Sequence, residues 1–290
     1  MRAGLPRRSL AKASRRVFLP TIALILLSTR PVLAHGSYHE RIDYLTGEIK
    51  KNPSDPLLHF ELADLLGQDG NVPLALENLD RVDALAPGEF LTDFLRGQVW
   101  LQAGEFARAK EALDRQLVSH PGNPRSLLLR ARAEQKLGQD QVSLADYREA
   151  LKRTPSPEPD LFQEVADTLA NHGYEKEAAQ VLSGGIEKLG KIPSLVLRAI
   201  DLEIKTKNFD AALKRIEDAR QSAPRPEPWM ARRAAVLAQA GHIEESRTAW
   251  KELEKHLASL PDQERTSHAM TNLAEETRQA LASLDSKTKP

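Results

Sequence analysis

The chain of 290 residues contains no cysteine, which excludes disulfide bonds, thiolate nucleophiles and lipid attachment through an N-terminal cysteine. Its 41 basic and 41 acidic residues balance, but residues 1–34 hold seven of the basic residues and no acidic one. The rest of the chain therefore carries 34 basic against 41 acidic residues, a formal charge of −7, which disfavours nonspecific binding to nucleic acid.

Residues 1–34 have the composition of a secretory signal peptide. Basic residues come first, the apolar run VFLPTIALILLS follows at 17–28, and the small-residue cleavage pattern Val-Leu-Ala ends at Ala34. This run is shorter than the roughly 20 residues that a helix needs to cross a bilayer. We therefore expect cleavage after Ala34 and no stable membrane span afterwards, with an uncleaved anchor as the alternative.

The segment from Ser14 to Leu19 reads SRRVFL and resembles a twin-arginine export motif, with Pro20 where lysine is common. The resemblance implies export of the folded protein from a bacterial cytoplasm. An ordinary signal for export of the unfolded chain, with additional arginines, is the alternative. Both routes predict a periplasmic or secreted protein, and a Gram-negative bacterium as its source.

Residues 35–55 follow as a short tail and a predicted capping helix. The apolar residues of the run YHERIDYLTGEIKK recur at helical spacing at Ile42, Leu45 and Ile49, and Pro53 ends the segment. The pattern matches the second helix of a hairpin whose first helix is missing. We therefore expect this helix to cover the N-terminal end of the structure.

From residue 56 onward the chain repeats a unit of 34 or 35 residues. Each unit has two amphipathic runs separated by a turn residue, with a small residue five positions after the turn and a large apolar residue nine positions after it. The turn residues are Gly70, Gly104, Gly138, Gly173, Lys207 and Gly241. A single unit is too small to bury its own apolar faces, so each unit needs its neighbours.

This period and pattern resemble the tetratricopeptide repeat (TPR) family. The resemblance covers six units at 56–261 and implies an all-α, right-handed superhelical solenoid of about six helix hairpins between N- and C-terminal capping helices. We expect the C-terminal capping helix at 262–285 and a disordered tail at 286–290.

The chain departs from the TPR pattern at a few positions. Lys207 takes the place of a turn glycine, and Gly190 takes the place of a proline between units. Glu134 and Glu203 occupy a slot in which the other four units have leucine or tryptophan. We therefore expect irregular packing in the third and fifth units within an otherwise regular stack.

In the TPR family the first helices of the repeats line a concave groove that receives a segment of a partner protein. Carried over by position, the resemblance implies a groove lined by Phe60, Asp64, Phe94, Gln98, Leu101, Arg125, Leu128, Arg132, Gln135, Asp167 and Asp201. The family's clamp for a C-terminal carboxylate has lysine and asparagine where this chain has Phe60 and Asp64, which disfavours that mode. We expect an apolar start, a basic region at Arg125 and Arg132 that selects an acidic segment, and an acidic region beyond it.

No catalytic motif stands out, since the sequence lacks HExxH, G-x-S-x-G and a phosphate-binding glycine loop. We therefore expect a non-catalytic interaction scaffold with no cofactor, whose oligomeric state the sequence leaves open. The alternative is a periplasmic copper- or nickel-binding protein whose repeats dock a recipient. In that case the mature α-amine, His35, His39 and Glu40 would bind the metal. Copper titration of the mature protein distinguishes the two.

The export signal generates the first testable prediction. Mass spectrometry of the processed protein should find His35 at its N-terminus, and finding Arg15 in the mature chain would contradict cleavage after Ala34. Replacing Arg15 and Arg16 by lysine should block export on the twin-arginine route, whereas unchanged export would leave the ordinary route.

Overall fold

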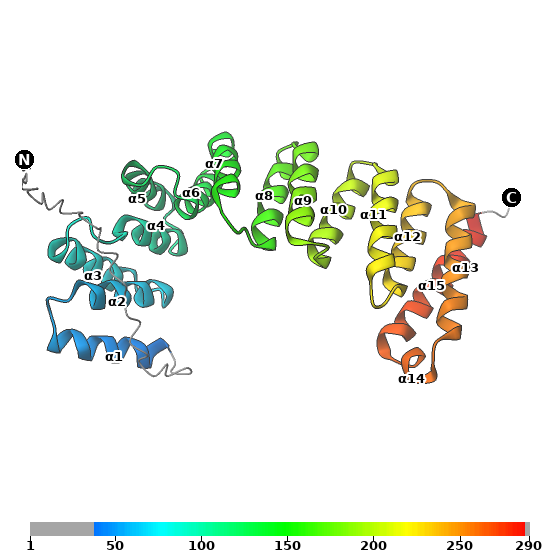
Figure 1. Ribbon diagram of the computed structural model, residues 1–290, viewed down its shortest axis with the longest axis horizontal. Helices are drawn as coiled ribbons and strands as arrows, with labels where there is room; N and C mark the ends of the chain where they lie inside the picture. The colour runs from blue at the N-terminus through cyan, green and yellow to red at the C-terminus, as the bar shows by residue number, and fades with distance from the viewer. Residues whose placement is uncertain (1–37, 288–290) are drawn as a thin grey trace, which may run out of the picture.

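The computed structural model describes residues 38–287, which form a single row of α-helices (Figure 1). The helices are α1 (Tyr38–Lys51), α2 (Pro56–Gln68), α3 (Val72–Leu85), α4 (Thr92–Gln102), α5 (Phe106–Ser119), α6 (Pro124–Lys136), α7 (Asp140–Arg153), α8 (Pro159–Asn171), α9 (Glu175–Leu189), α10 (Pro193–Lys205), α11 (Phe209–Ser222), α12 (Glu227–Gln239), α13 (Ile243–Ser259), α14 (Asp262–Arg265) and α15 (His268–Lys287). The structure confirms the all-α repeat fold. The signal segment and its cleavage site lie outside the described residues.

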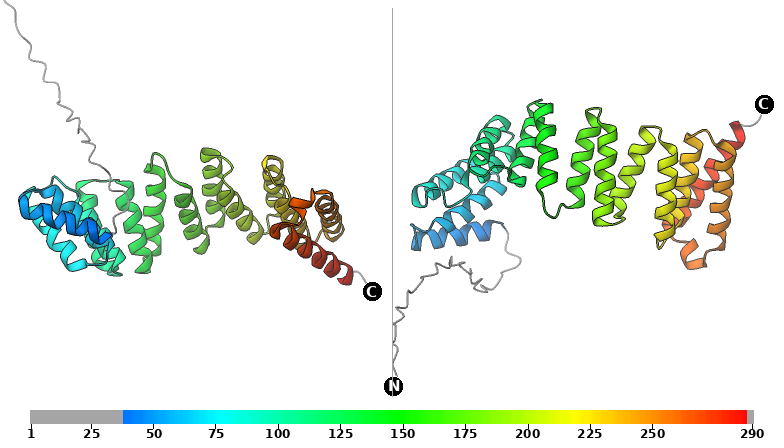
Figure 2. Two further views of the ribbon diagram at one scale, coloured as in Figure 1. Left: turned by 90° about the horizontal axis from the view of Figure 1, so that it is seen from below. Right: turned by 45° about the horizontal axis from the view of Figure 1, so that its top comes forward.

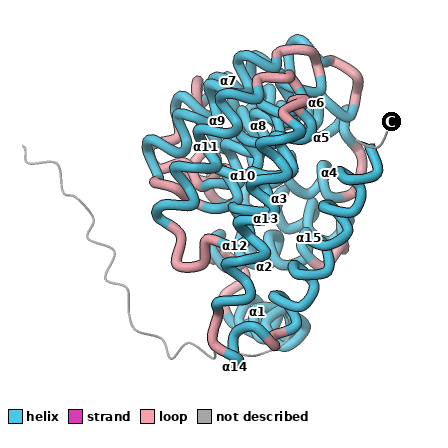
Figure 3. Tube along the Cα trace, turned by 90° about the vertical axis from the view of Figure 1, so that its right-hand side faces the viewer, coloured by secondary structure: helices cyan, strands magenta, loops and turns pink. Residues whose placement is uncertain are grey.

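Helices α2 to α13 pair into six hairpins that stand side by side along the row, seen from two further sides in Figure 2. The helix axes rotate along the row, lying almost horizontally at α1 and α2 and upright at α8 and α9 in Figure 1. Viewed from the end, the hairpins lie one behind another with their loops at the edges (Figure 3). Helix α1 packs on α2, and α15 packs on α13 and α12, so a single helix closes each end of the stack.

All six hairpins turn in the same way because the repeated turn residue adopts a positive φ. In every hairpin the backbone N–H of the next residue donates to the carbonyl four positions before the turn residue, at 2.7–2.9 Å. This bond is the mark of a Schellman ending, which satisfies a carbonyl that the helix end leaves free. Some helix starts are also fixed by neighbouring residues. At the start of α2, Pro56 is the first helical residue, and the carboxylate of Asp55 before it accepts a bond from the N–H of Leu57.

The two helices of a hairpin touch at small residues. The positions seven before and five after the turn residue are buried in all six hairpins, and every residue there except Ile200 is glycine, alanine or serine. At Gly97, an added Cβ would lie 2.5 Å from Cγ of Leu113 on the facing helix. The two serines donate to the facing backbone, Ser143 to the carbonyl of Ala131 at 2.8 Å and Ser246 to that of Ala234 at 2.7 Å.

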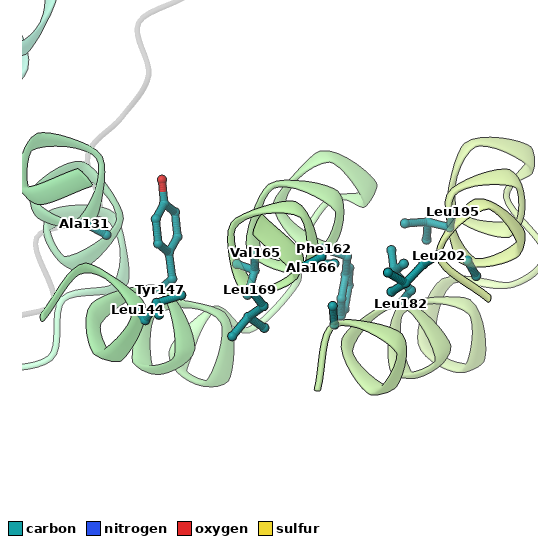
Figure 4. Packing of buried hydrophobic residues seen from close by; sticks show 13 residues of the cluster. Ala131, Leu144, Tyr147, Phe162, Val165, Ala166, Leu169, Leu182, Leu195 and Leu202 are labelled. Carbon is teal, nitrogen blue, oxygen red and sulfur yellow. The ribbon is translucent and has the colours of Figure 1, made fainter. Parts of the chain in front are cut away.

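The apolar core runs along the row without a break at the proline-rich link between α7 and α8. One cluster joins Tyr147 of α7 to Val165 and Leu169 of α8 and Leu182 of α9, and continues to Leu195 of α10 in the next hairpin (Figure 4). Within the described part of the chain, no helix combines the length and apolarity needed to cross a bilayer.

The C-terminal cap differs from the single helix expected at 262–285. The structure has a short α14, a break at Thr266 and Ser267, and then α15, which runs to Lys287 and so extends into the expected tail. At the break, the Thr266 N–H and hydroxyl both donate to the carbonyl of Asp262, at 3.0 and 2.8 Å. This local bonding ends the first turn of helix and lets α15 change direction.

Lys207 adopts the glycine conformation of the other five turns. Its φ is 59°, and it is the only residue other than glycine with a positive φ within 38–287. The N–H of Asn208 still donates to the carbonyl of Glu203 at 2.7 Å. The departure therefore introduces backbone strain at Lys207 without changing the turn.

Replacing Lys207 by glycine should therefore stabilise the protein by about 1 kcal/mol. The left-handed conformation costs a residue with a Cβ roughly 1–2 kcal/mol, and part of this gain is lost to the larger entropy of glycine in the unfolded chain. Urea-induced unfolding followed by circular dichroism measures the change. The exposed helical residue Lys214 is the control, because Lys214→Gly should destabilise by about 1 kcal/mol, and destabilisation by Lys207→Gly would contradict the strain.

The close approach of α4 and α5 gives a second stability prediction. Ala109 is fully buried at this contact, so Ala109→Leu should destabilise by about 1–3 kcal/mol through overpacking. Ala107 on the exposed face of α5 is the matched control, since Ala107→Leu should change little. In a stack held by nearest neighbours, hydrogen exchange should rise mainly in α2 to α7, and uniform loosening from α2 to α13 would contradict this picture.

Candidate partner-binding surface

The first helices of the hairpins form one side of the stack, which we call the inner wall: α2, α4, α6, α8, α10 and α12. Helices α2 and α4, α4 and α6, and α8 and α10 contact each other directly across neighbouring hairpins. Such contacts are expected on the inner side of a curved row, where successive elements lie closest together. The predicted groove residues all lie on these first helices.

The start of the inner wall is apolar and partly exposed. Leu57 on α2 is 50% exposed, and Leu91, the residue before α4, is 38% exposed. Phe60 is half-buried, and its ring lies 5.3 Å from that of Phe90 at an interplanar angle of 39°. Phe94 is also half-buried. The ring that packs against Phe60 is that of Phe90, which lies in the loop before α4.

Several predicted residues continue this surface over α2, α4 and α6. They are half-buried, as expected for a wall that is open on one side only: Asp64, Gln98, Leu101, Leu128 and Gln135. Asp64 makes no ion pair with any described residue. The side-chain oxygen of Gln135 lies 3.4 Å from the hydroxyl of Tyr147 on α7.

The two arginines predicted to select an acidic segment have different surroundings. Arg132 donates from Nε and Nη2 to the two carboxylate oxygens of Glu164 on α8, both at 2.7 Å. Burial raises the pKa of Glu164, but the bonds from Arg132 and the Tyr147 hydroxyl hold it below its ordinary value. Arg125 is exposed and makes no ion pair within 38–287. Arg125 is therefore the arginine of this pair whose charge faces solvent without a partner.

The predicted acidic stretch is also paired. Asp167 accepts from Arg198, and Asp201 accepts from Arg232 in the next hairpin. With Arg132 and Glu164, these pairs follow one rule: the residue six before one turn meets the residue nine before the next. We call the three pairs the ion-pair ladder. Each acid keeps an arginine beside it, so this part of the wall presents little unpaired charge.

The ladder divides the inner wall into two parts. Between the first and second hairpins the corresponding positions hold Asp64 and Leu95, and between the second and third they hold Gln98 and Leu129, which cannot form ion pairs. Helices α2, α4 and the start of α6 therefore present apolar groups together with Asp64, Gln98 and the exposed Arg125, none of them held in the ladder. On α6 to α12, each carboxylate of the ladder is already bound to an arginine on a neighbouring first helix. The sequence carried a signal for the ladder, since opposite charges recur 31 or 32 residues apart.

The described residues give little support to the hypothesis of a copper- or nickel-binding protein. His39 lies exposed near the start of α1, and His35 lies outside the described part of the chain. Across residues 38–287, His, Asp and Glu side chains do not gather in any group of three suited to a metal ion.

A separate open cleft of about 760 Å³ lies on α11, α12 and α13, away from every predicted groove residue. Leu213, Met230 and Ala249 contribute its apolar lining, and charged side chains surround them. Glu217 binds Arg220 at 2.6 Å, so part of that charge is satisfied internally. Mixed and partly paired charges give this cleft no clear preference for a ligand, and the inner wall remains the better candidate.

The comparisons with known proteins agree with the repeat pattern. The family model described as a tetratricopeptide repeat matches residues 94–157, from α4 to the link before α8. No curated protein sequence matches the chain significantly.

Among solved structures, PilW, described as a type IV pilus biogenesis factor, matches 64% of this chain and 86% of its own with 16% identity and a TM-score of 0.52. MamA from Desulfovibrio magneticus RS-1 matches 52% and 85% with 22% identity and a TM-score of 0.46. YrrB, a TPR protein with an unusual peptide-binding site, matches 70% and 99% with 18% identity and a TM-score of 0.48.

The family match, the fold shared with PilW and six hairpins with one turn geometry lead to the same conclusion. The chain has the tetratricopeptide repeat fold, and its residues 94–157 match the model of that family.

Proposed function

We propose that the protein is a non-catalytic adaptor that works outside the cytoplasm and binds a segment of a partner protein on the first half of its inner wall. The observation that carries this proposal is the exposed apolar surface at Leu57 and Leu91 beside the Phe60–Phe90 pair. Contiguous exposed apolar groups are costly on a surface with no partner and are typical of interaction sites. The location rests on the signal-like composition of residues 1–34.

The partner segment should carry an apolar or aromatic anchor. Aromatic and large aliphatic anchors dominate the energetics of protein interfaces. An acidic residue of the segment would be placed near Arg125, which is exposed and unpaired among the described residues. Arg132 contributes less to this selection because Glu164 already binds its guanidinium.

The test begins with capture of partners by the mature protein from a periplasmic fraction, followed by affinity measurements with the segment that is captured. Leu57→Ser and Phe94→Ala should weaken binding tenfold or more at all salt concentrations, because they remove apolar contacts. Arg125→Glu should weaken it most at low salt, because a single surface charge acts mainly through screened attraction.

One control variant accompanies these. Lys214→Ala lies on an exposed face of α11, outside the inner wall, and should leave affinity unchanged. Lys110 is unsuitable as a control, because it binds Asp114 at 2.8 Å and lies 3.9 Å from Glu134. Wall variants that keep full affinity, together with an outer-face variant that loses it, would show that the partner binds elsewhere.

A further inference from the structure

Glu134 occupies a slot that is apolar in most of the hairpins. The slot lies four positions before the turn residue and holds Leu66, Trp100, Leu169 and Leu237 in four of the six units. Glu134 is fully buried in α6, and neither of its carboxylate oxygens has a hydrogen-bond partner. A buried carboxylate without hydrogen bonds is unfavourable in its charged form.

The cations beside Glu134 are already bound to other acids. Lys110 Nζ and Arg130 Nε each lie 3.9 Å from Oε1 of Glu134. Arg130 donates to Asp146 at 2.6 and 2.9 Å and to Asp114 at 2.8 Å, and Lys110 donates to Asp114 at 2.8 Å. Helices α5, α6 and α7 thus bring three carboxyl groups together with two cations. The cluster is balanced only when one of the acids keeps its proton.

Glu203 provides a matched comparison, because it occupies the same slot in the fifth hairpin. Its carboxylate accepts three bonds from Arg215, at 2.7, 3.0 and 3.2 Å. Arg215 lies eight positions after its turn residue, and the third hairpin has Asp146 at that position. The same residue in the same slot therefore faces an arginine in one hairpin and an aspartate in the other.

We propose that Glu134 makes the contact of α6 with α5 and α7 sensitive to pH near neutrality, weakening the joint between the second and third hairpins when it loses its proton. This inference does not depend on the proposed function. Arg130 and Lys110 lie near enough to pair with a charged Glu134. To do so, Arg130 would have to give up a bond to Asp146 or Asp114, or Lys110 its bond to Asp114.

The direction of the effect follows from the surroundings of Glu134. Burial first, and the charge of Asp146 next, raise the pKa of Glu134 to about 7, against the opposite influence of Arg130 and Lys110. In an opened joint the pKa returns toward its ordinary value of 4.5. The closed state therefore holds more protons, and its stability falls as the pH rises from about 4.5 to about 7 and then levels off.

Other titrating groups contribute to the pH dependence in a different pH range, or their contribution cancels in the comparison of variants. Hydrogen bonds from Lys110 and Arg130 outweigh burial and keep the pKa of Asp114 below its ordinary value, so Asp114 matters only under acid conditions. His172 beside α8 has a raised pKa because it bonds the carbonyl of Thr168 and the carboxylate of Asp140. Its contribution has the same sign above the ordinary pKa of histidine. The difference between wild type and Glu134→Gln isolates Glu134.

Hydrogen exchange of the full chain, corrected for intrinsic rates and measured between pH 5.5 and 8, tests the proposal. In wild type, the opening equilibrium of α5 to α7 should rise by up to about tenfold per pH unit until pH 7, the limit for one proton. Glu134→Gln should remove this rise, since it keeps the shape and lacks the charge. Glu203→Gln should increase opening of α10 and α11 at every pH, because it removes the partner of Arg215.

Asp146→Asn provides a second variant in case Glu134→Gln does not fold. It removes the neighbouring acid and frees Arg130 to bind Glu134, so the rise in opening should level off at a lower pH than in wild type. An unchanged pH profile in either folded variant, or a wild-type profile without the rise, would overturn the proposal.

Discussion

The fold depends on one steric constraint, the close approach of the two helices in every hairpin. Glycine, alanine or serine occupies nearly all of the facing positions, and the hydroxyls of the two buried serines donate hydrogen bonds to backbone carbonyls of the facing helix. Close-packed interiors tolerate little change in volume at such contacts. Because the turn geometry and this contact recur with one period, each hairpin presents its first helix on the same side, and the inner wall follows from the repeat itself.

Equivalent positions on the first helices, which the packing treats alike, differ in charge from one hairpin to the next. The second and third hairpins place Leu95 and Leu129 where later hairpins place Glu164, Arg198 and Arg232. The later residues tie each first helix to the preceding one. These pairs are partly exposed, and such pairs typically contribute no more than about 1 kcal/mol each to stability. Their larger consequence is for recognition, because a carboxylate bound to arginine offers little to a partner, whereas the apolar start of the wall stays open.

Features set by the repeat period could be predicted from the sequence. Contacts between neighbouring hairpins could not. The hairpins, their turns and the helices at both ends follow from spacing and turn chemistry, and Lys207 keeps the glycine conformation because the whole stack imposes it. The pairing of Arg132 with Glu164 and of Phe60 with Phe90 required the offset between neighbouring hairpins. Considered one helix at a time, Arg132 is predicted to be an unpaired cation and Asp167 an unpaired acid. The break before α15 depends on hydroxyl bonding that apolar periodicity does not report.

Glu134 and Glu203 illustrate the limit of reading a repeat by its consensus. Both replace an apolar residue, and both were expected to disturb their hairpins. In the fifth hairpin Arg215 turns the replacement into a bonded pair, whereas in the third the nearest cations serve Asp114 and Asp146. Removing one member of a buried pair leaves a charge without compensation, which costs more than the pair itself contributes. Since each hairpin of a solenoid contacts mainly its neighbours, the consequence stays local. The chain can therefore hold a proton-sensitive joint beside the apolar part of its inner wall while the rest of the stack remains insensitive to it.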